Sequence, residues 1–167
     1  MDKLIDTWDR IIAAVEPVGD WVALLPLRLI LAWEFWESGV MKYGGNNWFG
    51  SVQDNFLFPF NIIPADFSWF IATWSELLGG IALALGLFTR FWAITFIILS
   101  IVAISGVHWP DDWNGLAELS KGYAISDKGF GNYKLPLLYI IMLLPLGFSG
   151  AGKASLDQLL SRFIRKN

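Results

Sequence analysis

Residues 76–90 have the sequence ELLGGIALALGLFTR, and this stretch decides the fold of the chain. It places the carboxylate of Glu76 inside an apolar run from about residue 67 to residue 88, which is long enough to cross a lipid bilayer. An ionised side chain at that depth is unfavourable in lipid, so it normally faces a partner or a cavity. Gly79 and Gly80 lack side chains and would let a second helix approach closely. We therefore expect Glu76 to be held against another helix.

The composition places the whole chain in the same class. Of its 167 residues, 55% are hydrophobic and 16% are charged, and the mean hydropathy is +0.50. A soluble domain is apolar in about 45–50% of its residues and charged in about 25%. The sequence contains no cysteine, which excludes thiol redox chemistry and thiolate metal ligation by this chain, and it carries no haem, flavin or iron–sulfur signature. Nucleic acid is not an expected partner, because no basic patch alternates with aromatic residues.

The apolar runs predict an all-α integral membrane four-helix bundle formed by a single domain over residues 1–167. Residues 1–16 have apolar positions at helical spacing and acidic residues on the other face, which predicts an amphipathic helix at the membrane interface that ends at residues 17–20. A second amphipathic helix is expected in the tail from Ser155. The four expected spans are residues 21–43, 68–88, 91–107 and 133–148.

The basic residues favour one orientation of this bundle. Four spans would bring both termini to one side of the membrane, together with Lys3, Arg10, Arg90, Lys153, Arg162, Arg165 and Lys166. The opposite side would carry only Lys42, Lys121, Lys128 and Lys134. Because basic residues accumulate on the cytoplasmic side, we expect a multi-pass protein of a bacterial inner membrane with both termini in the cytoplasm.

The first span carries an unusual set of charges. Arg28, Glu34, Glu37 and Lys42 lie on or beside one face of an otherwise apolar helix, and this face must look into the bundle. At the helical rise, Glu34, Glu37 and Glu76 would all lie roughly 9–14 Å from the outer ends of their spans. The sequence therefore predicts three carboxylates in one layer, with Lys42 above them and Arg28 deeper.

Three interpretations of this layer are open. The charges can pair and fix the order of the helices without further function. Alternatively, carboxyl groups in apolar surroundings, beside Lys42 and His108, can take or give protons, and aromatic walls such as Trp36 and Trp74 would suit a flat ring such as a quinone. In the third interpretation, carboxylates and His108 would bind a metal, with His108 as the one histidine ligand that the sequence offers. Taken alone, His108 is more often a polar residue at a helix end than a ligand.

Three stretches resemble the DoxX family of small membrane proteins. They are Arg28 with residues 34–42 (EFWESGVMK), residues 76–80 with 86–90, and residues 150–157 (GAGKASLD). The resemblance implies a four-helix membrane bundle. It also implies an association with membrane redox systems, including a thiosulfate:quinone oxidoreductase, or with biosynthetic clusters for metal-binding peptides. By this match Arg28, Lys42, Glu76 and Arg90 are the family positions, whereas the roles of Glu34 and Glu37 depend on the helix-face argument alone.

These observations lead to one hypothesis and two alternatives. The protein would be the membrane subunit of a redox system and would hold a quinone in an outer-leaflet pocket. In that pocket Glu76 would handle protons, Glu34 and Glu37 would relay them, and Lys42 and His108 would contact a ring oxygen. The expected partners are the lipid bilayer and a protein of a redox or biosynthetic system, and a homo-oligomer is compatible with the sequence. The alternatives are a non-enzymatic scaffold that recruits a partner through residues 44–67 and 108–132, and a carrier or metal-handling protein.

Overall fold

The computed structural model describes residues 2–164, with Asp2, Lys3 and Asp20 described by their backbones alone. Over these residues the fold is all-α, with seven α-helices and no strand. Two of the tail's basic residues, Arg165 and Lys166, lie outside the described part. The α-helices are α1 (Asp2–Val22), α2 (Leu25–Gly44), α3 (Ala65–Leu85), α4 (Thr89–Ala103), α5 (Leu116–Leu119), α6 (Lys134–Ser149) and α7 (Leu156–Ile164). A π-helix, Ile104–His108, continues α4, and short 3-10 turns lie at Phe49–Ser51, Gln53–Asn55 and Ser120–Gly122.

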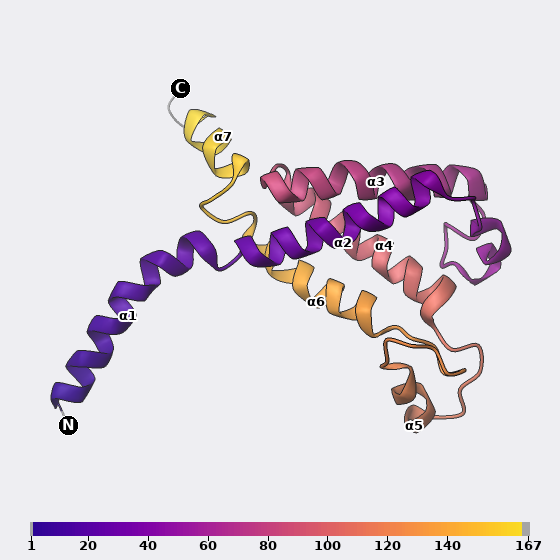
Figure 1. The fold of residues 1–167 in the computed structure, drawn as a ribbon, viewed down its shortest axis with the longest axis horizontal. Helices are drawn as coiled ribbons and strands as arrows, with labels where there is room; N and C mark the ends of the chain where they lie inside the picture. The colour runs from indigo at the N-terminus through magenta and orange to yellow at the C-terminus, as the bar shows by residue number, and fades with distance from the viewer. Residues whose placement is uncertain (1, 165–167) are drawn as a thin grey trace.

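The body of the molecule is a ring of four helices. Helix α2 packs against α3 and α6, and α4 packs against the same two helices. The α2–α3 and α4–α6 pairs are each antiparallel, and they diverge toward the end that carries the two long loops (Figure 1). The core at the other end is formed by fully buried apolar side chains, including stacked Phe35 and Phe96 rings with centroids 3.8 Å apart. The two pairs are thus joined at one end and splayed at the other.

Glycines set the close approach of α2 and α3. A Cβ atom added at Gly39 of α2 would lie 2.9 Å from the backbone nitrogen of Leu77, and one at Gly80 of α3 would lie 3.1 Å from the carbonyl oxygen of Ala32. No side chain fits at either position without movement of a backbone. The expectation that small residues around Glu76 admit a second helix is therefore confirmed, and that helix is α2.

Two of the four expected spans are long and apolar enough to cross a membrane. They are Ala65–Leu85 and Thr89–His108, the second and third of the expected spans. Helix α6 is apolar but shorter, and α2 has sufficient length but carries four charged side chains. The four-pass arrangement remains a prediction.

Helix α1 corrects one expectation. We expected the N-terminal helix to end at residues 17–20, but α1 continues through Pro17 to Val22, and the Ala23 amide still donates to the Gly19 carbonyl. The prediction was wrong because a proline removes only its own amide bond, and a helix can bend there instead of ending. The apolar residues of α1 are exposed, and α1 and α7 both extend from the end of the bundle opposite the long loops (Figure 1).

Candidate functional site

A buried ion pair joins α2 to α3. The Nζ atom of Lys42 lies 2.8 Å from Oε2 and 3.0 Å from Oε1 of Glu76. Ser38, one turn before Lys42 on the same face of α2, accepts a hydrogen bond from Nζ at 2.8 Å and donates to Oε1 at 3.2 Å. The Glu76 side chain is 2% exposed and the Lys42 side chain is 14% exposed. The carboxylate is therefore neutralised by its neighbours in a nearly closed environment.

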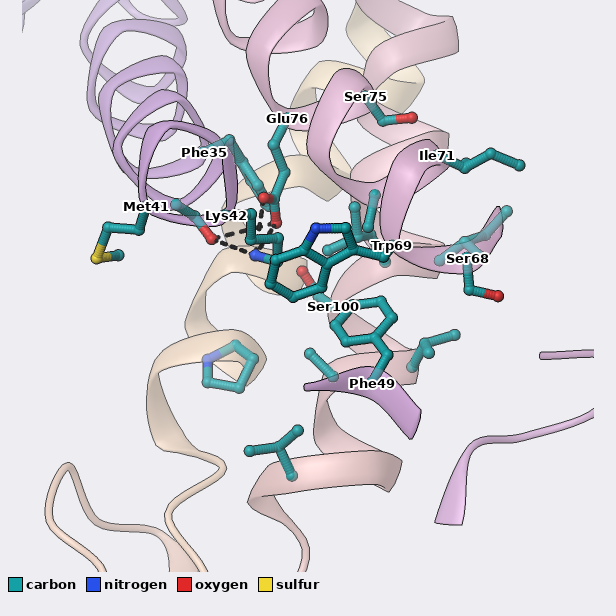
Figure 2. A pocket seen from close by; sticks show the side chains of 18 of the residues that line it. Phe35, Met41, Lys42, Phe49, Ser68, Trp69, Ile71, Ser75, Glu76 and Ser100 are labelled. Atoms are coloured by element: carbon teal, nitrogen blue, oxygen red, sulfur yellow. Dashed lines mark hydrogen bonds and ion pairs between the residues drawn. The ribbon is translucent and has the colours of Figure 1, made fainter. Parts of the chain in front are cut away.

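This ion pair lies in the wall of a cavity of about 740 Å³ between the two helix pairs. Figure 2 shows Lys42 and Glu76 meeting beside Trp69 and Ser100, with the Phe49 ring on the loop side. A cavity of this volume falls in the range of ligand sites for small molecules, roughly 300–1,000 Å³. Its lining is mostly apolar and aromatic, so the few polar groups would orient a bound molecule.

A second polar group lies where α2 meets α6. The hydroxyl of Tyr139 on α6 donates a hydrogen bond of 2.5 Å to Oε2 of Glu34 on α2. Both residues line the cavity, and Glu37 lies at its exposed rim. Nδ1 of His108, also in the lining, is 2.6 Å from Oδ1 of Asn132, which fixes the imidazole against the second long loop.

Aromatic residues of the first long loop cover the cavity. Phe49 and Phe56 are buried and pack edge-to-face, and Phe49 makes the same contact with Trp69 of α3. The loop is held by hydrogen bonds from the Gln53 amide to the carbonyls of Asn61 and Ile63. The residues from Trp48 to Phe60 thus form the cover on the loop side.

Arg28 does not line the cavity, because it is buried at the other end of the bundle. Its guanidinium donates to the carbonyl oxygens of Ala151 at 2.6 Å, Ala154 at 3.0 Å and Ala84 at 3.2 Å. It therefore connects α2 to the end of α3 and to the segment that precedes α7. We call this meeting point of α2, the end of α3 and the segment before α7 the Arg28 junction.

The same junction contains two further parts of the family stretches, residues 86–90 and residues 150–157. Gly86 adopts a left-handed conformation (φ 67°) where a Cβ atom would collide with Ser155 and Arg28. The carboxylate of Asp157 accepts hydrogen bonds from the amides of Phe88 and Thr89, so it caps the start of α4. Residues far apart in the sequence thus lock the turn between α3 and α4.

The structure brings together five of the eight residues singled out from the sequence. Glu34, Glu37, Lys42, Glu76 and His108 all line the cavity, whereas Arg28, Trp36 and Trp74 do not. Trp74 instead contacts the rings of Tyr43 and Phe70 at the surface, and the backbone of Trp36 packs against Gly80. Helical periodicity finds shared faces on one helix, but it does not determine which aromatic residues turn inward.

Several lining residues were not singled out from the sequence. Ser38 belongs to the polar face predicted for the first span, one turn from both Glu34 and Lys42, but it was not chosen as a site residue. Tyr139 is a polar aromatic residue within an apolar run, which is a weaker signal. The aromatic cover from the loop has no periodic pattern and could not be predicted. Among the described residues, no group of three or more His, Cys, Asp or Glu side chains could hold a metal ion.

A helical bundle with two helices long and apolar enough to cross a membrane is typical of a small membrane protein. The profile of the DoxX family matches residues 23–109, and the chain belongs to this family. The resemblance found in the sequence is therefore confirmed. A Haemophilus influenzae protein described as uncharacterized is 45% identical over 148 residues, which covers 89% of each chain. No solved structure matches this chain.

Proposed function

We propose that this DoxX family membrane protein is the membrane subunit of a redox system and that its cavity holds a quinone or a similar apolar ring. The observation that carries the proposal is the arrangement of the cavity, in which aromatic walls surround about 740 Å³ beside the Lys42–Glu76 pair. A quinone head group is flat and apolar on its faces and carries oxygens at its edge. Aromatic walls suit the faces, and hydrogen-bond donors suit the oxygens.

The polar residues have distinct roles in this proposal. Lys42 and His108 contact a ring oxygen, because both residues line the cavity and carry nitrogen atoms that can donate a hydrogen bond. Glu76 handles protons beside Lys42, and Glu34 and Glu37 relay them toward the rim, where Glu37 is exposed. The electrons come from a partner protein, since this chain has no signature of a bound redox cofactor.

One observation favours a second candidate, a scaffold that recruits a partner protein. Ser38, Lys42 and Glu76 satisfy one another, and the Arg28 guanidinium is held by three backbone carbonyls. Charges satisfied in this way can fix helix order with no ligand at all. The scaffold would then present its long loops to the partner.

The test is organic extraction of the protein purified in mild detergent, with quinone detection and elemental analysis. We expect near-stoichiometric quinone in the wild type and its loss in Glu76→Gln. A bound metal lost from the variant would favour the metal-handling alternative. The absence of both ligands from the wild type, even after exposure to quinone-loaded vesicles, would overturn the proposal in favour of the scaffold.

A matched pair of variants on α4 separates loss of ligand from loss of fold. Ser100→Phe places a ring in the cavity, because Ser100 is buried and lines it, and we expect this variant to exclude quinone. Ile94→Phe adds a ring on the exposed face of the same helix, outside the lining, and should retain quinone. Equal quinone content in the two variants, with both folded, would contradict binding in this cavity.

A further inference from the structure

The cavity reaches the surface of the bundle between α3 and α4. Ile71 of α3 and Ile98 of α4 line it, yet their side chains are 43% and 47% exposed. Figure 2 shows Ile71 and Ser75 pointing away from the Lys42–Glu76 pair, toward the outer side of α3. Since α3 and α4 are the two helices long and apolar enough to cross a membrane, this opening would face lipid if both helices span the bilayer.

Packing on either side of this opening keeps it in place. Toward the α3–α4 turn, Gly79 lies directly against Trp92 and Phe96, so the two helices touch. Toward the loops, Phe56 of the aromatic cover packs against Gly106 in the π-helix that follows α4, and no side chain fits at that glycine. The Phe56 ring therefore fills the space beside Gly106, and the opening lies between this contact and the contact at Gly79.

The other side of the cavity, between α2 and α6, has a different character. The Tyr139–Glu34 hydrogen bond ties these helices together across the gap. Glu37 lies at the rim on this side and is exposed. A long hydrocarbon chain would have to pass charged and hydrogen-bonded groups there, which is unfavourable. Isoleucine side chains line the α3–α4 side instead.

From these contacts we propose that the opening between α3 and α4, bordered by Ile71 and Ile98, is a lateral portal that holds the hydrocarbon tail of the ligand. The inference rests on the proposed function and narrows its ligand class to a ring with a long apolar tail. The ring lies near Lys42 and Glu76, while the tail passes through the portal into the bilayer. The tail is surrounded by hydrocarbon both in the bilayer and in the portal, so the portal selects tailed quinones by giving the chain a path out of the cavity and not by removing it from water.

The test compares two probes and two pairs of variants. The probes are a decyl-substituted benzoquinone and the same benzoquinone with a methyl group in place of the decyl chain. Ile71→Trp and Ile98→Trp fill the portal, whereas Leu78→Trp and Ile94→Trp place the same residue at exposed positions of the same helices outside the cavity lining. Retained quinone is measured after reconstitution in lipid and detergent extraction.

We expect the portal variants to retain less than about a tenth of the decyl quinone that the wild type holds, because the decyl chain of a ring beside Lys42 and Glu76 would have no path out and would overpack the cavity. Retention of the methyl quinone should be unchanged in them, and the two control variants should match the wild type with both probes. Two results would overturn the portal while leaving quinone binding by the wild-type cavity intact. The portal variants could retain the decyl quinone as well as the controls do, or they could lose both probes equally. If the wild type retains neither probe, the proposed function itself fails.

A chemical block covers the case in which tryptophan disturbs folding. Because the chain has no cysteine, Ile71→Cys and Ile98→Cys each introduce a unique thiol. Alkylation of the folded variant with a bulky maleimide should abolish retention of the decyl quinone and spare the methyl quinone. Unchanged retention of the decyl quinone after complete alkylation would overturn the inference.

Discussion

Lys42 and Glu76 form the feature on which the site depends. Each side chain neutralises the charge of the other inside the bundle, and Ser38 completes the set of hydrogen bonds. A buried ion pair adds little net stability, but removal of one partner leaves the other charge buried and unpaired, which is strongly unfavourable. The pair therefore acts mainly as a constraint on how the two helices pack. It fixes the register of α2 along α3 at the level of the cavity.

Lys42→Met should lower the free energy of unfolding by about 3–5 kcal/mol, because it leaves Glu76 buried without a counter-charge. The measurement is equilibrium unfolding by denaturing detergent in mixed micelles. Lys128→Met, at an exposed loop position, is the control and should change little. The double variant Lys42→Met with Glu76→Met should recover part of the loss. A single variant as stable as the wild type would show that the ion pair does not constrain the fold.

The sequence predicted that Glu76 needs a partner on a neighbouring helix, but it did not identify which charge. Arg28, Lys42 and the two glutamates of the first span all lay on or near one helical face. Arg28 and Lys42 lie almost four turns apart on α2, so one reaches backbone carbonyls at the junction and the other reaches Glu76. Helical geometry alone gives the face, whereas the vertical register of two helices depends on their packing.

At the scale of elements, the close pairing of α2 and α3 positions the ion pair. Gly39 lies one residue after Ser38 on α2 and touches the backbone of α3 beside Glu76. Any widening of this crossing would lengthen the Lys42–Glu76 contact. The sequence shows the glycine at position 39, but it does not predict which helix packs against it.

Gly39→Ala should destabilise the protein by about 1–3 kcal/mol, because its added methyl group overlaps the Leu77 backbone nitrogen. Gly44→Ala on the same helix is the matched control, since no heavy atom lies within 4 Å of an added Cβ atom there. Thermal unfolding in detergent would measure both. Equal midpoints for the two variants would contradict a tight helix crossing at Gly39.

At the scale of the whole molecule, the sequence predicted the all-α class and the helices that form the bundle. It could not predict that these helices form two pairs that splay apart, because that angle depends on Phe56, Gly106 and the loop between α2 and α3. The cavity is a consequence of this splay. Its existence therefore could not be derived from periodicity, although five of its lining residues were identified.

The arrangement of termini and loops gives a prediction about topology. Helices α1 and α7 lie at one end of the bundle and the long loops at the other. Single cysteines introduced at Asp9 and Arg162 should therefore lie on one side of the membrane, and those introduced at Asp54 and Lys128 on the opposite side. We expect a membrane-impermeant maleimide to label the loop positions in spheroplasts, and the terminal positions only after permeabilisation. Labelling of all four positions from one side would contradict a spanning bundle.

The Arg28 junction also has a consequence for biosynthesis. Its two carbonyl partners in the final turn, at Ala151 and Ala154, lie 123 and 126 positions further along the chain. The guanidinium of Arg28 therefore cannot form these two hydrogen bonds until residues 151–154 have been synthesised. Synthesis of α2 therefore precedes the contacts that hold its Arg28 side chain. Residues 151–154 can complete the Arg28 junction only after α2, α3, α4 and α6 have all been synthesised.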